Sequence, residues 1–297
     1  MNPITELLAT THVILLDGAM GTMLIQSGLD QGESPDLWNV KHPEKVKNVH
    51  RAYIEAGSRL VLTNTFGGTS IRLKHHNLQD RAQSLNRAAA ENLCEVVNSI
   101  PYPVIAAGSM GPTGEMLKPM GSLTFDDAKT AFSEQAKALA AGGVDIIWIE
   151  TMSDMNETKA AIEGVREVCD LPITATMTFD TNGFTMMGVS PQQAFEALSI
   201  YDLAAIGANC GNGPDEIEDV IQKMHTLDPD IILIAKANAG MPKLVQGEVT
   251  YDGTPEVMAE YAQRVHASGA SLIGACCGST PDHIHAMAEA LGVSVPE

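Results

Sequence analysis

Residues 103–150 have the sequence PVIAAGSMGPTGEMLKPMGSLTFDDAKTAFSEQAKALAAGGVDIIWIE, and this stretch contains the unit from which the whole chain is built. Continuous apolar runs begin and end it, at 103–110 and 144–150, as expected for strands of a parallel sheet that is covered on both faces. Between them, residues 124–143 predict a helix with a cap at Thr124, acidic residues in its first turn and a closing glycine pair. The stretch therefore predicts a strand, a crossover helix and a second, parallel strand.

The same unit recurs along the chain. Apolar runs of strand length lie at 13–17, 59–66, 103–110, 144–150, 172–179, 204–210, 231–239 and 270–277. Helical patterns between them start with proline or threonine and end with glycine, as at 43–57 and 254–269. Eight strand–helix units predict an α/β fold, a single (β/α)8 TIM barrel formed by one domain over residues 1–297. An open, doubly wound sheet is the alternative, although no G-x-G-x-x-G follows the first strand.

The composition fits a globular protein and argues against several kinds of partner. Hydrophobic residues make up 44% of the chain and charged residues 19%, so a sizeable core is expected. The formal net charge of −19 argues against nucleic acid and anionic membranes, which attract basic proteins. No targeting segment or membrane span is expected, because Asp17 interrupts the first apolar run. The five cysteines are an odd number, which suits reduced thiols and a cytoplasmic location.

Polar and thiol side chains stand at the C-terminal ends of the predicted strands, where TIM barrels build their active sites. They are Asp17, Asn64, Glu150, Cys210, Asn238, Cys276 and Cys277. Three thiolates from two strand ends can hold one Zn²⁺ and leave its fourth position open, which distinguishes a catalytic zinc site from a structural one. The alternatives are cysteines that pack as small apolar residues, or a vicinal disulfide between Cys276 and Cys277.

Two carboxylates at this end of the barrel favour a cationic partner. Asp17 precedes glycines whose N–H groups can meet a carboxylate, with capping of the following turn as the alternative. Glu150 ends an apolar strand, where an unpaired carboxylate is costly to bury, so a substrate ammonium or an internal salt bridge is expected there.

Seven segments resemble the homocysteine S-methyltransferase family, which includes betaine–homocysteine methyltransferases, S-methylmethionine–homocysteine methyltransferases and the homocysteine module of cobalamin-dependent methionine synthase. They are DGAMGT (17–22), EAGSRLVLTNTF (55–66), SMGPTGE (109–115), WIETM (148–152), IGANCG (206–211), KANAG (236–240) and IGACCGSTPDHI (273–284). The resemblance covers essentially the whole chain, and the combination of NCG and GACCG with DGAMGT is its most specific part.

The resemblance implies an S-methyltransferase of class EC 2.1.1 that methylates the thiolate of L-homocysteine on zinc and forms methionine. The implied zinc ligands are Cys210, Cys276 and Cys277, with Asn238 as a displaceable fourth ligand. The implied substrate contacts are Asp17 and Glu150 for the ammonium, the backbone at Gly18 and Ala19 for the carboxylate, and Asn209 and Trp38 as further contacts. Zinc supplies the thiolate at neutral pH, so no general base is assigned.

The methyl donor is expected to be a small onium compound, with glycine betaine first, S-methylmethionine second and dimethylsulfonium compounds third. Betaine enzymes surround their donor with aromatic side chains, but the positions that match two of their tyrosines are here Gly67 and Thr151. Trp38, in a loop at 25–42 expected to cover the barrel mouth, would supply one wall. The chain is too short for folate, cobalamin or adenosylmethionine modules, so methyl transfer from a separate corrinoid protein is the alternative.

Two other classes of function compete with this interpretation. A zinc hydrolase is disfavoured, because three thiolates would make zinc-bound water a poor acid. A non-catalytic partner of a corrinoid protein is the other option. A monomer or a modest homo-oligomer is expected.

Overall fold

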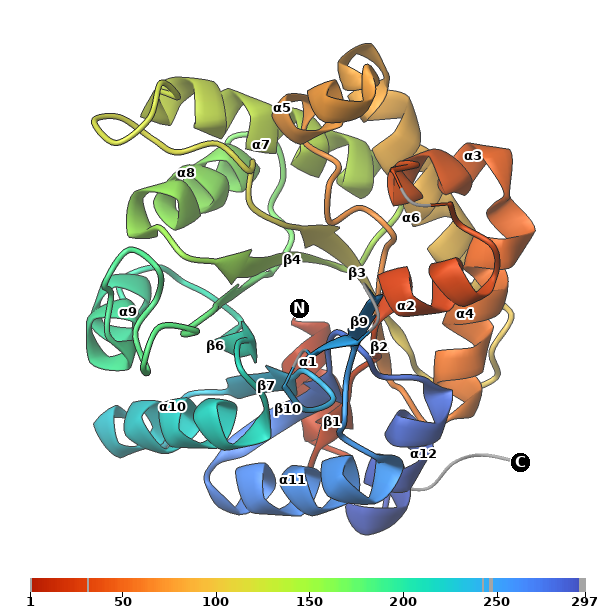
Figure 1. Cartoon of the computed structure of the whole chain (residues 1–297), viewed down its shortest axis with the longest axis vertical. Coiled ribbons are helices and arrows are strands. Elements are labelled where there is room, and N and C mark those ends of the chain that lie inside the picture. The colour runs from red at the N-terminus through yellow and green to blue at the C-terminus, as the bar shows by residue number, and fades with distance from the viewer. Residues whose placement is uncertain (1, 31, 242, 246–247, 294–297) are drawn as a thin grey trace.

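The computed structural model describes residues 2–30, 32–241, 243–245 and 248–293, and its central feature is a barrel of eight parallel strands (Figure 1). The barrel strands are β1 (Ile14–Leu15), β2 (Leu60–Leu62), β3 (Ile105–Met110), β4 (Ile146–Met152), β5 (Ile173–Met177), β6 (Ala205–Cys210), β7 (Leu233–Ala237) and β10 (Ala270–Ala275). They follow the order β1, β10, β7, β6, β5, β4, β3, β2. A parallel bridge between Leu16 and Leu60 joins the end of β1 to β2 and brings the two edges together.

Each of the eight predicted apolar runs contains one barrel strand, so the predicted TIM barrel is confirmed and the doubly wound alternative is wrong. A closed barrel and an open sheet differ in whether the sheet has unpaired edge strands. An open sheet leaves two strands unpaired on one side, whereas here the first and second strands of the chain meet.

The α-helices surround the barrel, apart from the first one, which packs at its N-terminal end (Figure 1). They are α1 (Pro3–Leu8), α2 (Met20–Gln26), α3 (Trp38–Lys41), α4 (Pro43–Glu55), α5 (Ser70–Leu73), α6 (Ala82–Asn98), α7 (Phe125–Ala141), α8 (Met155–Arg166), α9 (Pro191–Leu198), α10 (Pro214–Leu227), α11 (Pro255–Ala267) and α12 (Pro281–Ala290). Short 3-10 turns lie at Pro35–Leu37, Lys74–His76 and Gln79–Arg81. The predicted cap is confirmed, since the Thr124 side chain accepts a hydrogen bond from the backbone N–H of Asp127. Within the described residues, no helix combines the length and apolar character needed to cross a bilayer.

The chain between β1 and α4 differs from its prediction. A loop was expected at 25–42, but α2 ends inside this range, and a 3-10 turn at Pro35–Leu37 followed by α3 occupies most of its second half. A second feature without a sequence prediction is the hairpin of β8 (Lys243–Val245) and β9 (Glu248–Thr250), which pair antiparallel between β7 and α11.

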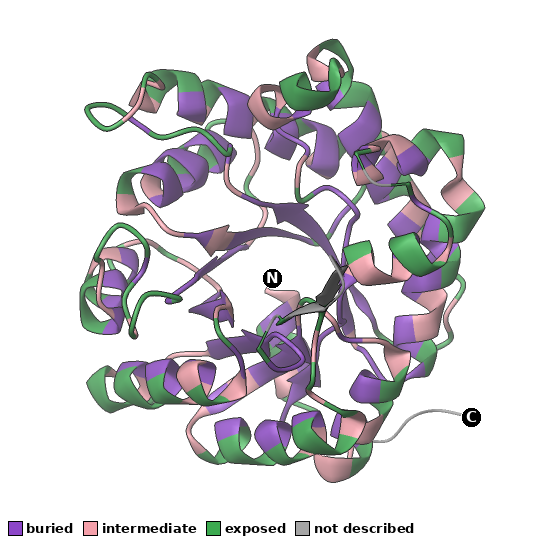
Figure 2. Cartoon of the chain, viewed as in Figure 1, coloured by how far each residue is buried: buried purple, intermediate pink, exposed green. Residues whose placement is uncertain are grey.

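Most residues of the barrel strands are buried on both faces, and Figure 2 shows these strands mainly in the colour of buried residues. One apolar cluster lies inside the barrel and includes Ile146, Trp148 and Ile234, together with Ile4 of α1. The alternate residues of β4, such as Ile147, belong to the cluster that the surrounding helices share. Because α1 packs against the interior cluster at the N-terminal end of the barrel, the C-terminal end is the one left for a site.

Strand periodicity then decides which polar side chains enter the barrel. Side chains two apart on a strand point to the same face. Trp148 of β4 and Ile234 of β7 point into the barrel, so Glu150 and Lys236, two residues further along each strand, point into it as well. We call the inward-pointing residues of the strands the interior row. Residues of the same row on other strands are Ser109, Asn209 and Cys276. These side chains form a polar layer above the apolar interior.

Candidate active site

A cavity of about 270 Å³ lies at the C-terminal end of the barrel. It is lined by the turn after β1, by the segment after β2 and by polar side chains of the interior rows. Asp17, Gly18, Ala19, Glu150 and the three predicted cysteine ligands all line it. The structure thus brings together residues from β1, β4, β6 and β10, as predicted from the strand ends.

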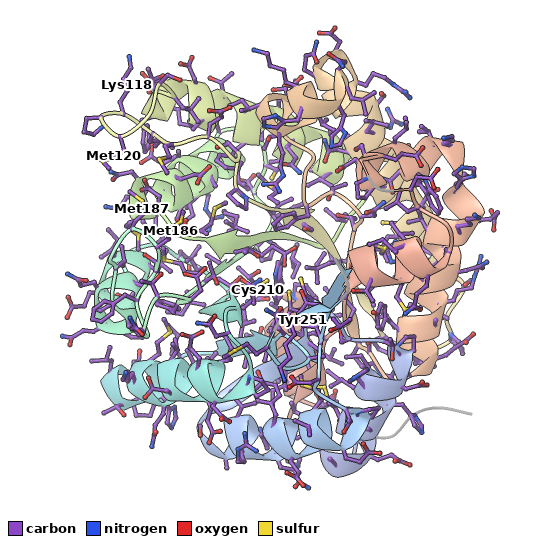
Figure 3. The ribbon with its side chains drawn as sticks, viewed as in Figure 1. Lys118, Met120, Met186, Met187, Cys210 and Tyr251 are labelled. Carbon is purple, nitrogen blue, oxygen red and sulfur yellow. The ribbon has the colours of Figure 1, made fainter. Side chains whose placement is uncertain are left out.

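Three thiols meet at one side of this cavity. The Sγ atoms of Cys210 and Cys276 are 2.9 Å apart, and those of Cys210, Cys276 and Cys277 all lie within 4.8 Å of one another. All are free thiols, so the alternative of a vicinal disulfide is wrong for this structure. Cys94 and Cys169 are also free and lie in and beside surface helices, away from the cluster. Figure 3 shows Cys210 near the centre of the barrel.

The cluster fits a zinc ion in both its chemistry and its spacing. Thiolates are preferred zinc ligands, and tetrahedral Zn–S bonds of about 2.3 Å separate two sulfurs by about 3.8 Å. The observed upper limit of 4.8 Å therefore requires only small side-chain adjustments. Thiol hydrogen bonds from Cys210 and Cys276 lower the pKa of Cys277 below its ordinary range, because they favour the thiolate. The site thus already stabilises one of the charges that a metal needs.

Asn209 positions Cys210, the next residue on β6, through a network of hydrogen bonds. Its amide oxygen accepts hydrogen bonds from the Thr151 N–H at 2.8 Å and from the Thr176 hydroxyl at 2.6 Å, and its amide nitrogen donates to Thr151 Oγ1 at 2.7 Å. The same nitrogen lies 3.4 Å from the Cys210 sulfur. Thr151 and Cys210 both have a φ of 61°, a left-handed conformation that is strained for residues other than glycine. Asn209 is fully buried and does not line the cavity, so its predicted contact with substrate has no support in the structure.

Replacing Asn209 by alanine is expected to destabilise the protein by about 2–4 kcal/mol and to weaken zinc binding. The change leaves the part-buried Thr151 N–H unpaired and removes the bonds that offset the strain at Cys210. Urea unfolding and zinc competition against a chelator measure the two effects. Asn98→Ala, at the exposed C-terminal end of α6, is the matched control and should leave zinc binding unchanged and stability within about 0.5 kcal/mol. Equal behaviour of the two variants would contradict the assigned role.

Asn238 links the two segments that carry the thiols. Its amide nitrogen donates to the carbonyl of Gly211 at 2.7 Å, and its amide oxygen accepts from the backbone N–H of Cys277 at 3.1 Å. It thus lies between the residue after Cys210 and the second cysteine of the pair. Its role as a displaceable fourth ligand stays a prediction.

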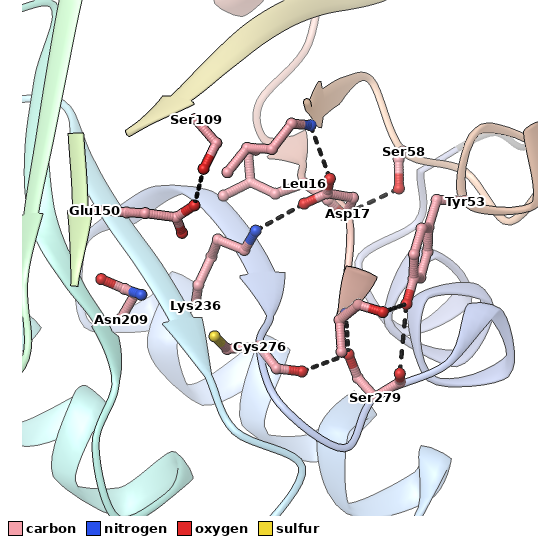
Figure 4. A network of polar contacts seen from close by, with 12 residues as sticks. Leu16, Asp17, Tyr53, Ser58, Ser109, Glu150, Asn209, Lys236, Cys276 and Ser279 are labelled. Atoms are coloured by element: carbon pink, nitrogen blue, oxygen red, sulfur yellow. Dashed lines mark hydrogen bonds and ion pairs between the residues drawn. The ribbon is translucent and has the colours of Figure 1, made fainter. Parts of the chain in front are cut away.

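Asp17 has an internal partner that the sequence analysis missed. Its Oδ1 accepts a hydrogen bond from the Lys236 ammonium at 2.7 Å, and its Oδ2 accepts one from the Leu62 N–H at 2.8 Å (Figure 4). Both side chains of this ion pair are nearly inaccessible to solvent. Burial raises the pKa of Asp17, and the Lys236 charge and the Leu62 N–H oppose that rise. Its expected role with a substrate ammonium is therefore shared with a lysine of the protein.

Glu150 is the carboxylate with more freedom to meet a ligand. It is buried, it lines the cavity and it accepts a hydrogen bond from the Ser109 hydroxyl (Figure 4). No lysine or arginine forms an ion pair with it among the described residues. Burial raises its pKa to about 7, although the charge of Lys236 opposes the rise. A cationic ligand would favour its ionised form.

The turn at Gly18 and Ala19 lines the cavity, but its backbone is partly in use. The Ala19 N–H donates to the Ser279 hydroxyl at 3.0 Å, and the Ala19 carbonyl accepts from the Tyr53 hydroxyl at 3.0 Å. A Cβ atom at Gly18 would lie 2.5 Å from Ser279 Oγ, so only glycine allows this close approach. The turn is fixed against the segment after the cysteine pair.

Trp38 does not reach the cavity. Its side chain is 1% exposed and packs in the apolar core, with its indole N–H donating to Glu33 at 3.0 Å and Lys45 4.7 Å from its ring centre. Within the segment 25–42, Pro35 is the residue that lines the cavity. The expectation that Trp38 forms a wall of a donor site is therefore wrong for this structure.

The fold and the cavity define a class of protein, namely TIM barrels with three thiols able to hold a metal at the C-terminal end of the barrel. The chain belongs to the homocysteine S-methyltransferase family, whose model matches residues 14–291. It is therefore a methyl-transferring enzyme by family.

Individual relatives agree with this assignment. The chain is 31% identical to a methionine synthase of Mycobacterium leprae. The match covers 97% of this chain and 25% of the methionine synthase, so the chain spans only part of that protein's length. Its fold is similar to the metallated form of the homocysteine methyltransferase MmuM from Escherichia coli, with a TM-score of 0.82, 24% identity and coverage of 96% and 99% of the two chains. A methyltransferase from Methanosarcina mazei has a TM-score of 0.61 at 11% identity, with coverage of 94% and 93%. The two structural likenesses concern the fold.

Proposed function

We propose that this protein transfers a methyl group from a small onium donor to the thiol of L-homocysteine, with Zn²⁺ as its cofactor. The observation that carries the proposal is the meeting of three free thiols within 4.8 Å in a cavity that also holds Glu150, a buried carboxylate with no ion pair to the described residues. The thiols suit zinc and the glutamate suits the ammonium of an amino acid. Membership of the homocysteine S-methyltransferase family supports the same substrate.

Cys210, Cys276 and Cys277 would hold the metal, which when bound would lower the pKa of a substrate thiol and so supply a thiolate at neutral pH. The remaining steps fall to the protein. Asn209 and Asn238 position the segments that carry the cysteines. Glu150, which lines the cavity, binds the substrate ammonium. A cytoplasmic location would keep the thiols reduced.

The cavity favours a sulfonium donor over a quaternary ammonium. Phe66 is the aromatic residue among the cavity-lining side chains, and the Arg72 guanidinium already lies 5.1 Å from its ring centre. An aromatic enclosure of the kind that stabilises a quaternary ammonium is therefore not formed by the residues that line this cavity. A thioether is a weaker base than a tertiary amine and therefore a better leaving group, so S-methylmethionine and dimethylsulfonioacetate precede glycine betaine as proposed donors.

A second candidate is methyl transfer from a corrinoid protein. It is favoured by the match to a methionine synthase that is about four times as long as this chain. The match covers 25% of that methionine synthase. In such an arrangement the chain would receive the methyl group from another protein or domain.

The direct test is methionine formation by purified, zinc-loaded protein given homocysteine and one donor at a time. The donors are S-methylmethionine, dimethylsulfonioacetate, glycine betaine and a methylated corrinoid protein. Turnover with one of the first three supports the onium proposal and names the donor. Turnover with the corrinoid protein alone would replace it by the second candidate. No methionine with any donor, despite bound zinc, would contradict methyl transfer to homocysteine.

Homocysteine affinity is expected to rise about tenfold between pH 6 and pH 8. The pKa of Glu150 is about 7, so the carboxyl is largely neutral at pH 6 and cannot attract an ammonium, whereas at pH 8 it is ionised. Titration calorimetry without donor measures the dissociation constant. Glu150→Gln is the control, because it keeps the titration of the substrate thiol and removes that of Glu150. An equally steep pH dependence in this variant would show that Glu150 does not bind the ammonium.

A further inference from the structure

Lys236 is a buried cation in the wall of the cavity. It continues the interior row of β7 two residues after Ile234, and it is 3% exposed. Its ammonium lies 2.7 Å from Asp17 Oδ1 and faces the cavity between Asp17 and Glu150 (Figure 4). Among the cavity-lining residues, Lys236 is the one that carries a positive charge.

Stability alone gives little reason for a lysine at this position. A buried ion pair is often no more stable than apolar residues of similar volume, because both charges lose their hydration. Apolar side chains at positions 17 and 236 together would avoid the cost of burying either charge. A buried charged side chain that faces a cavity, as Lys236 does, is a candidate for ligand binding.

The charges around the cavity follow an order that matches an amino acid. Glu150 carries a carboxylate without an ion-pair partner, Lys236 lies next, and Asp17 holds Lys236 from the other side. A lysine ammonium has three donors, and Asp17 takes one of them. The Ala19 N–H, which was expected to meet the substrate carboxylate, is already bonded to Ser279. Lys236 is therefore the stronger carboxylate donor at this site.

We propose that Lys236 binds the α-carboxylate of homocysteine while Glu150 binds its ammonium, an assignment that rests on the proposed function. Negative and positive groups then alternate from Glu150 through the substrate zwitterion to Lys236 and Asp17. Charge-assisted hydrogen bonds between buried groups are stronger than neutral ones. Lys236 thus makes the site specific for a free amino acid rather than for a simple aminothiol.

The test is titration calorimetry on zinc-loaded protein with no donor present. Three ligands are compared: homocysteine, aminopropanethiol, which lacks the carboxylate, and sulfanylbutanoate, which lacks the ammonium. Lys236→Met is expected to weaken homocysteine binding about 10- to 100-fold and to change aminopropanethiol binding by less than about threefold. Glu150→Gln is expected to weaken both amines and to spare sulfanylbutanoate. If Lys236→Met weakens homocysteine and aminopropanethiol equally, Lys236 acts only through Asp17 and the proposal is overturned.

Two further variants keep the test decisive. Lys236→Met leaves the Asp17 charge buried without its partner, so it is also made together with Asp17→Asn, which removes both charges. The double variant should show the same selective loss of homocysteine. Lys129→Met, at the surface pair with Glu167, is the matched lysine control and should bind all three ligands normally.

The failure of this inference can be told from failure of the proposed function. Homocysteine binding without any methyl transfer would remove the proposed reaction and leave the Lys236 result standing. If the unaltered protein binds none of the three ligands, both proposals are wrong.

Discussion

Alanine in place of Cys210, Cys276 or Cys277 is expected to weaken zinc binding more than 100-fold and to abolish methyl transfer. The loss of even an outer partner of a metal ligand reduces affinity about 10- to 100-fold, so the loss of one of three thiolates should exceed that. Each thiolate also contributes to the charge that offsets Zn²⁺, and the remaining two would leave the metal open to water.

The measurement is zinc content after dialysis against a chelator, together with methionine formation. Cys94→Ala and Cys169→Ala are the matched controls, because these free thiols lie outside the cluster. Both controls should retain zinc and activity. A variant at Cys210, Cys276 or Cys277 with a full zinc content and normal turnover would contradict the ligand assignment.

Alanine at Gly207 is expected to destabilise the barrel by more than about 3 kcal/mol. A Cβ atom at this position of β6 would lie 2.0 Å from the backbone oxygen of Ile234 on β7. Backbone atoms of a central strand pair cannot yield as a flexible side chain does, so β6 and β7 would have to separate. The same two strands carry Cys210 and Lys236, so the site should be lost with the pairing.

Chemical denaturation measures the free energy of unfolding of this variant. Gly21→Ala is the control, since a Cβ atom there meets no other atom within 4 Å. It should leave stability unchanged or slightly raise it, because alanine restricts the unfolded chain. A Gly207→Ala protein as stable as the control would show that β6 and β7 are less closely packed than described.

The barrel could be predicted from the sequence because its signal is repeated and local. Each strand is a continuous apolar run, and capping residues such as Thr124 mark where a helix begins. The ligand cysteines could be found for the same reason, since Cys210 ends one such run and Cys276 and Cys277 end another. The ends of parallel strands meet at one edge whatever the detailed packing is.

Other parts of the site depend on packing that no local pattern reveals. Trp38 lies in a polar segment and suggests an exposed loop, but its own helix, α3, packs against α4 and α6, and the side chain is buried. The role of Asn209 depends on Thr151 and Thr176, which belong to two neighbouring strands. Neither partner is close to it in sequence.

Lys236 shows an intermediate case. Its position two residues after Ile234 on a predicted strand signals an interior side chain. That signal was available, but a lysine inside an apolar row is interpretable only once Asp17 is known to lie beside it. The ion pair joins residues 219 positions apart in the chain.

The most direct test of the account is X-ray absorption at the zinc edge, recorded before and after homocysteine is added. We expect three sulfur neighbours at about 2.3 Å in the free protein, from Cys210, Cys276 and Cys277, and four after addition. Lys129→Met gives the expected change as a folded control. Fewer than three sulfurs in the free protein, or a sulfur count that homocysteine does not raise, would contradict the central claim that this three-thiol site binds the substrate sulfur.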